Sequence, residues 1–219
     1  MQQLTDPVDP DRTFVVSDTH FGHGRILEYC PGRQRWAKLS PFMMDAKLIA
    51  AWNSVVQKDD TVFHIGDFSL VPNAFMGDYV AALNGKIHLV KGNHDRCTNK
   101  KYLEAGMMEV VHTKSVNVLG VPLFFVHSCH NDDLPVSSLF PTGSDSPKYL
   151  FHGHAHGQSQ PESCRELNGI FGFDVGIDAL CTTLTAGPVP APLTLRKAVE
   201  YAQNYGKDQL QPKKEETGI

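Results

Sequence analysis

Short apolar runs alternate with longer amphipathic stretches through residues 13–91 of the chain. The apolar runs are rich in β-branched and aromatic residues and are bounded by polar ones, which predicts buried strands. These strands are expected at 13–17, 61–65 and 86–91. The stretches between them repeat apolar residues at helical spacing, which predicts helices at 40–57 and 74–83. Such an alternation favours a parallel sheet covered by helices.

The second half of the chain has a different, strand-rich pattern. Two apolar runs joined near Gly120 predict a hairpin at 115–128. Two further strands and a closing amphipathic helix are predicted at 147–153, 169–178 and 194–203. We therefore expect one α/β domain over 1–205, in which two sheets pack on each other with helices outside. A polar, flexible tail is expected at 206–219.

Composition narrows the class of protein and its partners. Hydrophobic residues make up 41% and charged residues 20% of the 219 residues, which is typical of a globular domain. The formal net charge of −4 argues against extended nucleic-acid binding, which requires a basic face. The chain has no apolar signal region and no apolar run of membrane-spanning length, so no membrane association is expected. The five cysteines include no C-x-x-C pair, which favours reduced thiols in a cytoplasmic protein.

Polar side chains that can bind metal ions follow the expected strands. The first three strands run into Asp18-Thr19-His20, Gly66-Asp67 and Gly92-Asn93-His94-Asp95. Later apolar runs end in His127 and in the segment HGHAHG at 152–157, which contains His154 and His156. The carboxyl ends of parallel strands meet at one edge of a sheet, so these side chains are expected close together. The set is too large for one tetrahedral zinc ion. It fits two ions with mixed nitrogen and oxygen ligands that share a carboxylate.

These blocks resemble the calcineurin-like metallophosphoesterase superfamily. The matching motifs are D-x-H at 18–20, G-D at 66–67, G-N-H-D at 92–95, a lone His at 127 and G-H-x-H at 153–156. Each block is weak alone, but five in order form a specific signal. The stretches SDTHFGHGRIL and DTVFHIGDFSL are also similar to the small single-domain bacterial and phage members. The resemblance implies a four-layer αββα sandwich of two mixed β-sheets flanked by helices.

The resemblance also implies a role for each matching residue. The first metal ion would be held by Asp18, His20 and His156. The second would be held by Asn93, His127 and His154, and Asp67 would bridge the two ions. His94 would face the substrate and support the leaving oxygen or the phosphoryl group in the transition state, while Asp95 would orient His94 or neutralise it. Mn²⁺ is the expected activating ion in vitro, with Fe, Zn²⁺, Ni²⁺ and Co²⁺ as alternatives.

The implied activity is hydrolysis of a phosphoester, in which a hydroxide that bridges the metal ions attacks phosphorus in line. A small phosphodiester, such as a cyclic or other small nucleotide, is the expected substrate by analogy with compact members of the superfamily. A phosphomonoesterase, including a protein phosphatase, or a nuclease would use the same site. A non-catalytic interaction scaffold is a further alternative, against which the complete ligand set and His94 argue. The sequence leaves the oligomeric state open.

Substrate contacts outside these motifs are expected on the surrounding loops. The candidates are His23, Arg33, Arg35 and His130. An arginine in the loop at 30–38 could form a bidentate pair with a phosphate, although a solvated surface arginine is the commoner outcome. Asp174 and Asp178 are expected to serve turns or the surface. Many small relatives follow the lone His with Tyr-Pro, whereas this chain has VHSCHND, so its substrate rim differs from theirs.

Overall fold

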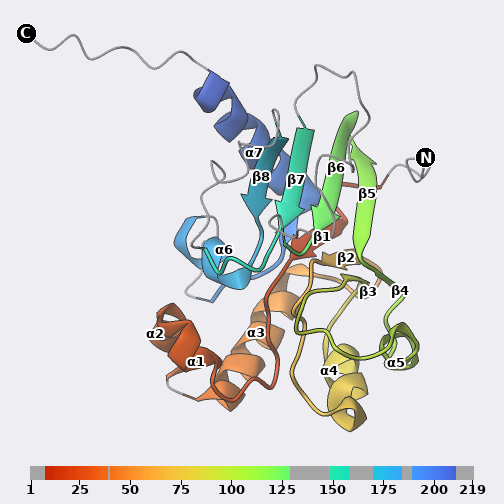
Figure 1. Cartoon of the computed structure of the whole chain (residues 1–219), viewed down its shortest axis with the longest axis vertical. Coiled ribbons are helices and arrows are strands. Elements are labelled where there is room, and N and C mark those ends of the chain that lie inside the picture. The colour runs from red at the N-terminus through yellow and green to blue at the C-terminus, as the bar shows by residue number, and fades with distance from the viewer. Residues whose placement is uncertain (1–7, 39, 129–147, 158–169, 184–188, 211–219) are drawn as a thin grey trace, which may run out of the picture.

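The first of two sheets contains the strands expected in the first half of the chain. The computed structural model describes residues 8–38, 40–128, 148–157, 170–183 and 189–210 (Figure 1). The first sheet has the strand order β4-β3-β2-β1-β9. Its strands are β1 (Thr13–Val16), β2 (Thr61–His64), β3 (Lys86–Val90), β4 (Glu109–Val111) and β9 (Leu193–Thr194). The strands β1 to β4 pair in parallel, and β9 runs antiparallel to β1. The carboxyl ends of β1, β2 and β3 therefore lie at one edge.

The second sheet has the strand order β5-β6-β7-β8. Its strands are β5 (Thr113–Val118), β6 (Val121–Val126), β7 (Lys148–His152) and β8 (Ile170–Asp174). The strands β5 and β6 form the antiparallel hairpin expected at 115–128, whereas β6, β7 and β8 pair in parallel. The expected α/β arrangement of two mixed sheets with flanking helices is thus confirmed.

Helices flank these sheets. They are α1 (Ile26–Tyr29), α2 (Gln34–Ala37), α3 (Pro41–Val55), α4 (Met76–Ala82), α5 (Asn99–Glu104), α6 (Ile177–Thr183) and α7 (Leu195–Leu210), with short 3₁₀ turns η1 (Pro31–Arg33) and η2 (Asn73–Phe75). Figure 1 shows α3 and α4 on the side of the first sheet that faces away from the second. The helix α7 packs against strands of both sheets. Among the described residues, no helix combines the length and apolar character needed to cross a membrane.

A row of aromatic rings connects the layers. Phe63 on β2 and Phe125 on β6 have ring centroids 5.2 Å apart, which joins the first sheet to the second. The row continues across the second sheet through Phe151 and Phe173 and reaches Tyr201 on α7. The four phenylalanines are buried. Large buried rings of this kind remove much apolar area from water and hold the layers together.

The structure corrects several element boundaries expected from the sequence. The segment 30–38, expected as a loop, contains η1 and α2. The expected strand at 169–178 ends at Asp174, and α6 begins within the same segment. The helix α7 continues to Leu210, into the expected tail at 206–219, whose remainder lies outside the described residues. The helix α2 was missed because a helix of one turn is too short to show a helical period in the sequence. The helix α7 extends beyond its expected end because a helix that has already formed can continue without an apolar face.

Candidate metal centre

The carboxyl ends of both sheets meet at one place. The backbone N–H of Asp18 donates to the carbonyl of Gly66, and that of His20 donates to the carbonyl of Asp67, each at 3.0 Å. From the second sheet, the backbone N–H of His154 donates to the two carboxylate oxygens of Asp18 at 3.1 and 3.0 Å. These bonds tie the loops after β1, β2 and β7 together. The strand-end residues expected as ligands are thereby brought to one centre.

One group of candidate ligand atoms surrounds the carboxamide of Asn93. Its Oδ1 lies 3.1 Å from Nε2 of His127 and 3.0 Å from Nδ1 of His154. The Nε2 atom of His127 is also 3.3 Å from Oδ2 of Asp67. Ligands about 2.0–2.2 Å from one tetrahedral ion are separated from each other by about 3.2–3.6 Å, close to these values. These four residues are placed to hold one divalent cation.

A second group lies beside the first and shares Asp67. Ligand atoms of Asp18, His20 and His156 lie within 4.8 Å of one another, as do those of Asp18, Asp67 and His127. The Nε2 atom of His20 is 3.6 Å from Oδ2 of Asp67. The rings of His20 and His156 stack with centroids 5.1 Å apart. One oxygen of Asp67 thus faces a histidine from each group.

The tautomer of His127 directs its Nε2 atom into the centre. Its Nδ1 atom is 2.8 Å from the carbonyl oxygen of Ile65, which only accepts, so Nδ1 carries a proton. Burial opposes further protonation, but the hydrogen bond to Asp67 and the charges of Asp18 and Asp67 outweigh it and raise the pKa of His127 to about 9. The centre therefore attracts positive charge. A cation can take the place of that proton.

His20 provides a direct test of whether the residues fit a metal ion. Both ring nitrogens are buried, and neither has a hydrogen-bond partner among the described residues. Burial lowers the pKa of His20 to about 2, so the ring is neutral. A buried polar atom without a partner costs free energy, whereas a neutral imidazole nitrogen is a good ligand for a divalent cation. The donor set of this centre fits such an ion.

Backbone strain is concentrated in the same residues. Five of the seven expected ligands have a left-handed backbone with positive φ: Asp18 (58°), His20 (51°), Asp67 (55°), His154 (70°) and His156 (49°). Among the other described residues, only Lys38 and Leu119 share this feature without being glycine. Such conformations cost on the order of 1–3 kcal/mol each and cluster at functional sites, where the surrounding structure imposes them. The strain is independent support for a functional centre.

Two glycines of the sequence motifs allow the close approach of backbone segments. A Cβ atom on Gly92 would overlap the carboxylate of Asp67, and one on Gly153 would overlap the side chains of Ser17 and Asp18. A residue with a side chain at either position would therefore displace a candidate ligand. This is the physical reason for a glycine before Asn93 and before His154.

Asp95 holds the loops after β2 and β3 together. Its carboxylate accepts the backbone N–H groups of Asp67 at 2.7 Å, Phe68 at 3.1 Å and Gly92 at 2.8 Å. Among the described contacts, no hydrogen bond joins this carboxylate to the ring of His94. The contacts therefore favour a positioning role for Asp95 in place of the direct partnership with His94 that the resemblance implies.

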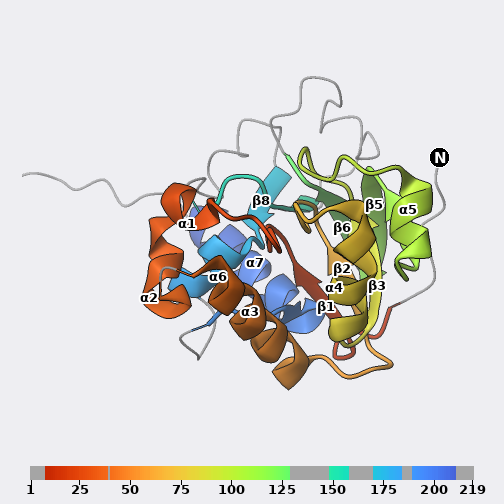
Figure 2. The ribbon, with the colours of Figure 1, turned by 90° about the horizontal axis from the view of Figure 1, so that it is seen from below.

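Arg33 and Asp178 form a buried ion pair behind His156. The Nε and Nη2 atoms of Arg33 donate to the Asp178 carboxylate at 2.8 and 2.7 Å, and the arginine is only 1% exposed. Its Nη2 and Nη1 atoms also donate to the carbonyls of Asp18 at 2.7 Å and Thr19 at 3.1 Å. Asp178 in turn lies 2.7 Å from Nδ1 of His156. Figure 2 shows how α1 and α2 lie beside α6, which carries Asp178.

These contacts revise two expectations from the sequence. Arg33 was expected as a substrate contact or a solvated arginine, but its donors are engaged by protein groups. Asp178 was expected at a turn or the surface, but it fixes the orientation of His156. In metal sites, a ligating histidine donates its second ring N–H to a carboxylate, and this hydrogen bond orients the ring. Asp178 closely follows β8, so the strand-end argument could have identified it. Asp174 does serve a turn, because it accepts the N–H of Gly176 at 2.8 Å.

His94 lies next to the centre but outside both groups. Its ring centroid is 5.4 Å from that of His20, and its backbone N–H donates to Oδ1 of Asp67 at 2.9 Å. The ring of His23 is 5.7 Å from that of His20, so it also borders the centre. Arg35 is exposed on α2, and His130 lies outside the described residues. The roles of these residues toward a substrate stay predictions.

Comparison with known proteins identifies the family. Residues 12–179 match the calcineurin-like phosphoesterase superfamily domain. The chain belongs to the calcineurin-like phosphoesterase superfamily. It is 29% identical over 126 residues to an uncharacterised protein of Methanocaldococcus jannaschii, covering 55% of this chain and 69% of that protein. It is 32% identical over 168 residues to the Gene 66 protein of Mycobacterium phage L5, covering 66% and 77%.

A solved structure shows the same fold. A protein of unknown function from Aquifex aeolicus superposes with a TM-score of 0.61 at 22% identity, covering 86% of this chain and 98% of that one. Membership of the superfamily supports hydrolysis of phosphoric esters as the reaction and divalent metal ions as the cofactors.

Proposed function

We propose that this protein is a phosphodiesterase that depends on two divalent metal ions. The observation that carries the proposal is the position of Asp67. Its Oδ2 atom faces His127 at 3.3 Å on one side and His20 at 3.6 Å on the other. Two cations at these positions would lower the pKa of a shared water molecule and neutralise charge on the phosphate oxygens. Mn²⁺ is the proposed activating ion, because the carboxylate and carboxamide oxygens of the donor set suit it.

The reaction converts a phosphodiester and water into a phosphomonoester and an alcohol. Water loses one proton as its oxygen forms a bond to phosphorus. The bond from phosphorus to the leaving oxygen breaks, and that oxygen departs with a proton. His94, half-buried beside the centre, is the proposed donor of this proton. Asp95 and Asp178 hold the loops and the ring of His156 in place.

A diester matches the charge of the centre better than a monoester does. The candidate ligands are histidines, carboxylates and one carboxamide, and the guanidinium of Arg33 is committed to Asp178. A phosphodiester carries one negative charge, whereas a monoester carries up to two. The second charge of a monoester would call for a cation beside the phosphate itself, whereas the cations of the pocket that His94 lines, Arg96 and Lys101, are proposed to lie toward the leaving group. We therefore propose a small phosphodiester as the substrate.

Metal-dependent hydrolysis of bis-p-nitrophenyl phosphate tests this function. Protein stripped with a chelator should be inactive, and Mn²⁺ added back should restore release of p-nitrophenol, with Ni²⁺, Zn²⁺ and Mg²⁺ tested in parallel. Release should be faster than from p-nitrophenyl phosphate. A faster reaction with the monoester would favour a phosphomonoesterase. No release from folded protein that contains two ions per chain would favour the scaffold.

Replacement of His94 by alanine should separate catalysis from metal binding. We expect turnover of bis-p-nitrophenyl phosphate to fall about 100-fold, the lower end of the range for a lost proton donor, because His94 is partly exposed and water can replace it. The metal content, measured by mass spectrometry, should not change. The exposed His112 gives a matched control, since H112A should retain full turnover. Unchanged turnover in H94A would exclude His94 as the donor.

A further inference from the structure

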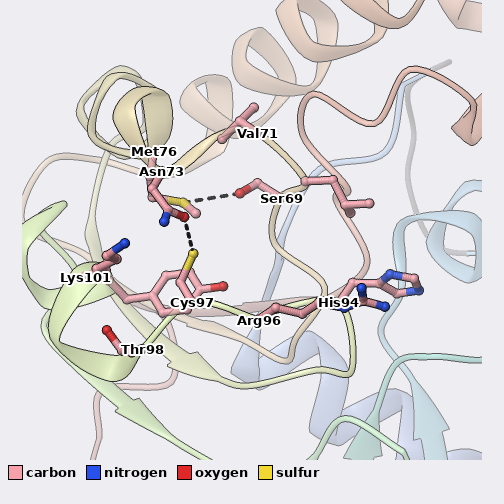
Figure 3. Close-up of a pocket in the computed structure, with 11 residues that line it drawn as sticks. Ser69, Val71, Asn73, Met76, His94, Arg96, Cys97, Thr98 and Lys101 are labelled. Carbon is pink, nitrogen blue, oxygen red and sulfur yellow. Dashed lines mark hydrogen bonds between the residues drawn. The ribbon is translucent and has the colours of Figure 1, made fainter.

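A pocket of about 580 Å³ opens beside His94. Its walls come from two segments that follow neighbouring strands of the first sheet. They are formed by Ser69, Leu70, Val71, Asn73 and Met76 after β2, and by His94, Arg96, Cys97, Thr98, Lys101 and Tyr102 after β3. Figure 3 shows His94 at one end of this lining and Lys101 at the other. The volume lies within the range typical of small-molecule sites.

The two walls of this pocket are fixed to each other and to the metal centre. The Sγ atom of Cys97 donates to Oδ1 of Asn73 at 2.6 Å, which joins the walls (Figure 3). The hydroxyl of Tyr102 lies 3.4 Å from the carboxylate of Asp95, which holds the loops of the centre. Leu70 is exposed and Val71 is half-buried, so these two residues of the lining give the pocket apolar surface. The pocket is therefore a preformed extension of the centre.

The lining of the pocket is positively charged, whereas the whole chain is negatively charged. Its lining includes Arg96 and Lys101 but no Asp or Glu, although the chain has a formal net charge of −4. Both side chains are exposed, and neither forms an ion pair with a described residue. By contrast, the neighbouring Lys100 lies 3.7 Å from Glu104. Unpaired cations at the mouth of an apolar pocket attract an organic group that carries negative charge.

We propose that this pocket binds the leaving group of the phosphodiester and selects a leaving group that bears a second anionic group. This inference rests on the proposed function, in which His94 gives a proton to the leaving oxygen. Because His94 lines one end of the pocket, the atoms beyond that oxygen extend along the lining toward Lys101 at the other end. A nucleotide with a further phosphate matches this combination of size, apolar surface and charge.

A matched pair of substrates tests the selection. Methyl 4-nitrophenyl phosphate and methyl 3-carboxy-4-nitrophenyl phosphate have the same reacting centre, and only the second has a leaving group with an added carboxylate. We expect kcat/KM to be about fivefold higher for the carboxylated substrate, the size expected for charge pairs that remain partly in water. In K101A and R96A this ratio should fall toward one, whereas K100A should keep both the ratio and the activity of the unmodified protein. An equal kcat/KM for the two substrates would overturn the proposal.

A binding experiment keeps this test separate from the activity itself. Adenosine 3′,5′-bisphosphate and adenosine 5′-monophosphate are titrated by calorimetry into the whole protein in the presence of chelator. The bisphosphate should bind about fivefold more tightly, and K101A should remove the difference while K100A retains it. If no metal ion supports hydrolysis but this difference is found, the proposed function fails and the anion-selective pocket stands. If the bisphosphate shows no advantage, the pocket proposal fails even in an active enzyme.

Discussion

Replacement of Asp67 by asparagine should abolish hydrolysis and remove metal ions from the protein. Asp67 contacts a histidine of each candidate group, His127 at 3.3 Å and His20 at 3.6 Å. Loss of an outer partner of one ligand already costs about 10–100-fold in metal affinity or activity. Loss of a charged ligand shared by two ions should cost about 1000-fold or more in kcat/KM. Hydrolysis of bis-p-nitrophenyl phosphate and metal analysis of the purified protein measure the two effects.

The asparagine variant should still fold, which makes the result interpretable. The carboxamide oxygen can accept the backbone N–H of His94, which Asp67 accepts at 2.9 Å in the native protein. The same substitution at Asp59, an exposed residue before β2, provides the control and should leave activity and metal content unchanged. If D67N retained two ions per chain and more than a tenth of the activity, Asp67 would not be the bridging ligand.

The position of Asp67 could be predicted because the relevant rule is local. A buried apolar run followed by glycine and a polar residue places that residue at the carboxyl end of a strand. Parallel pairing of β1, β2 and β3 then brings three such ends to one edge. In the second sheet, the hairpin and the parallel pairing of β6 with β7 bring His127, His154 and His156 to one edge. The two-sheet fold followed from the same pattern of apolar runs.

Features that depend on contacts between distant segments could not be predicted in this way. The partner of Arg33 lies 145 positions further along the chain, and no local pattern connects a short helix after the first strand to α6. The carboxylate of Asp95 was expected to act on the adjacent His94, but tertiary packing directs it to backbone groups of another loop. The pocket beside His94 likewise needs two loops that are adjacent only in the folded protein.

Arg33 should therefore matter for stability, although the sequence suggested a substrate contact. Its guanidinium bonds to four acceptor atoms in two other parts of the chain, which are the two carboxylate oxygens of Asp178 and the carbonyl oxygens of Asp18 and Thr19. Replacement by methionine keeps most of the apolar stem but leaves the Asp178 carboxylate and both carbonyls without these donors. Breaking one side of a buried ion pair typically costs about 3–5 kcal/mol. We expect R33M to lower the free energy of unfolding by this amount in urea denaturation monitored by circular dichroism.

Arg35 offers a control two positions away, since it is exposed on α2, the helix that follows Arg33 directly. R35M should change the free energy of unfolding by no more than about 0.5 kcal/mol. The double variant R33M/D178L removes both charges, so no unpaired charge stays buried. Its loss of unfolding free energy should therefore be smaller than the sum of the losses in R33M and D178L. Equal effects of R33M and R35M would mean that the buried pair does not hold the loop of Asp18 in place. A large loss in R33M that D178L partly reverses would show that this ion pair stabilises the fold beside the candidate ligands Asp18 and His156.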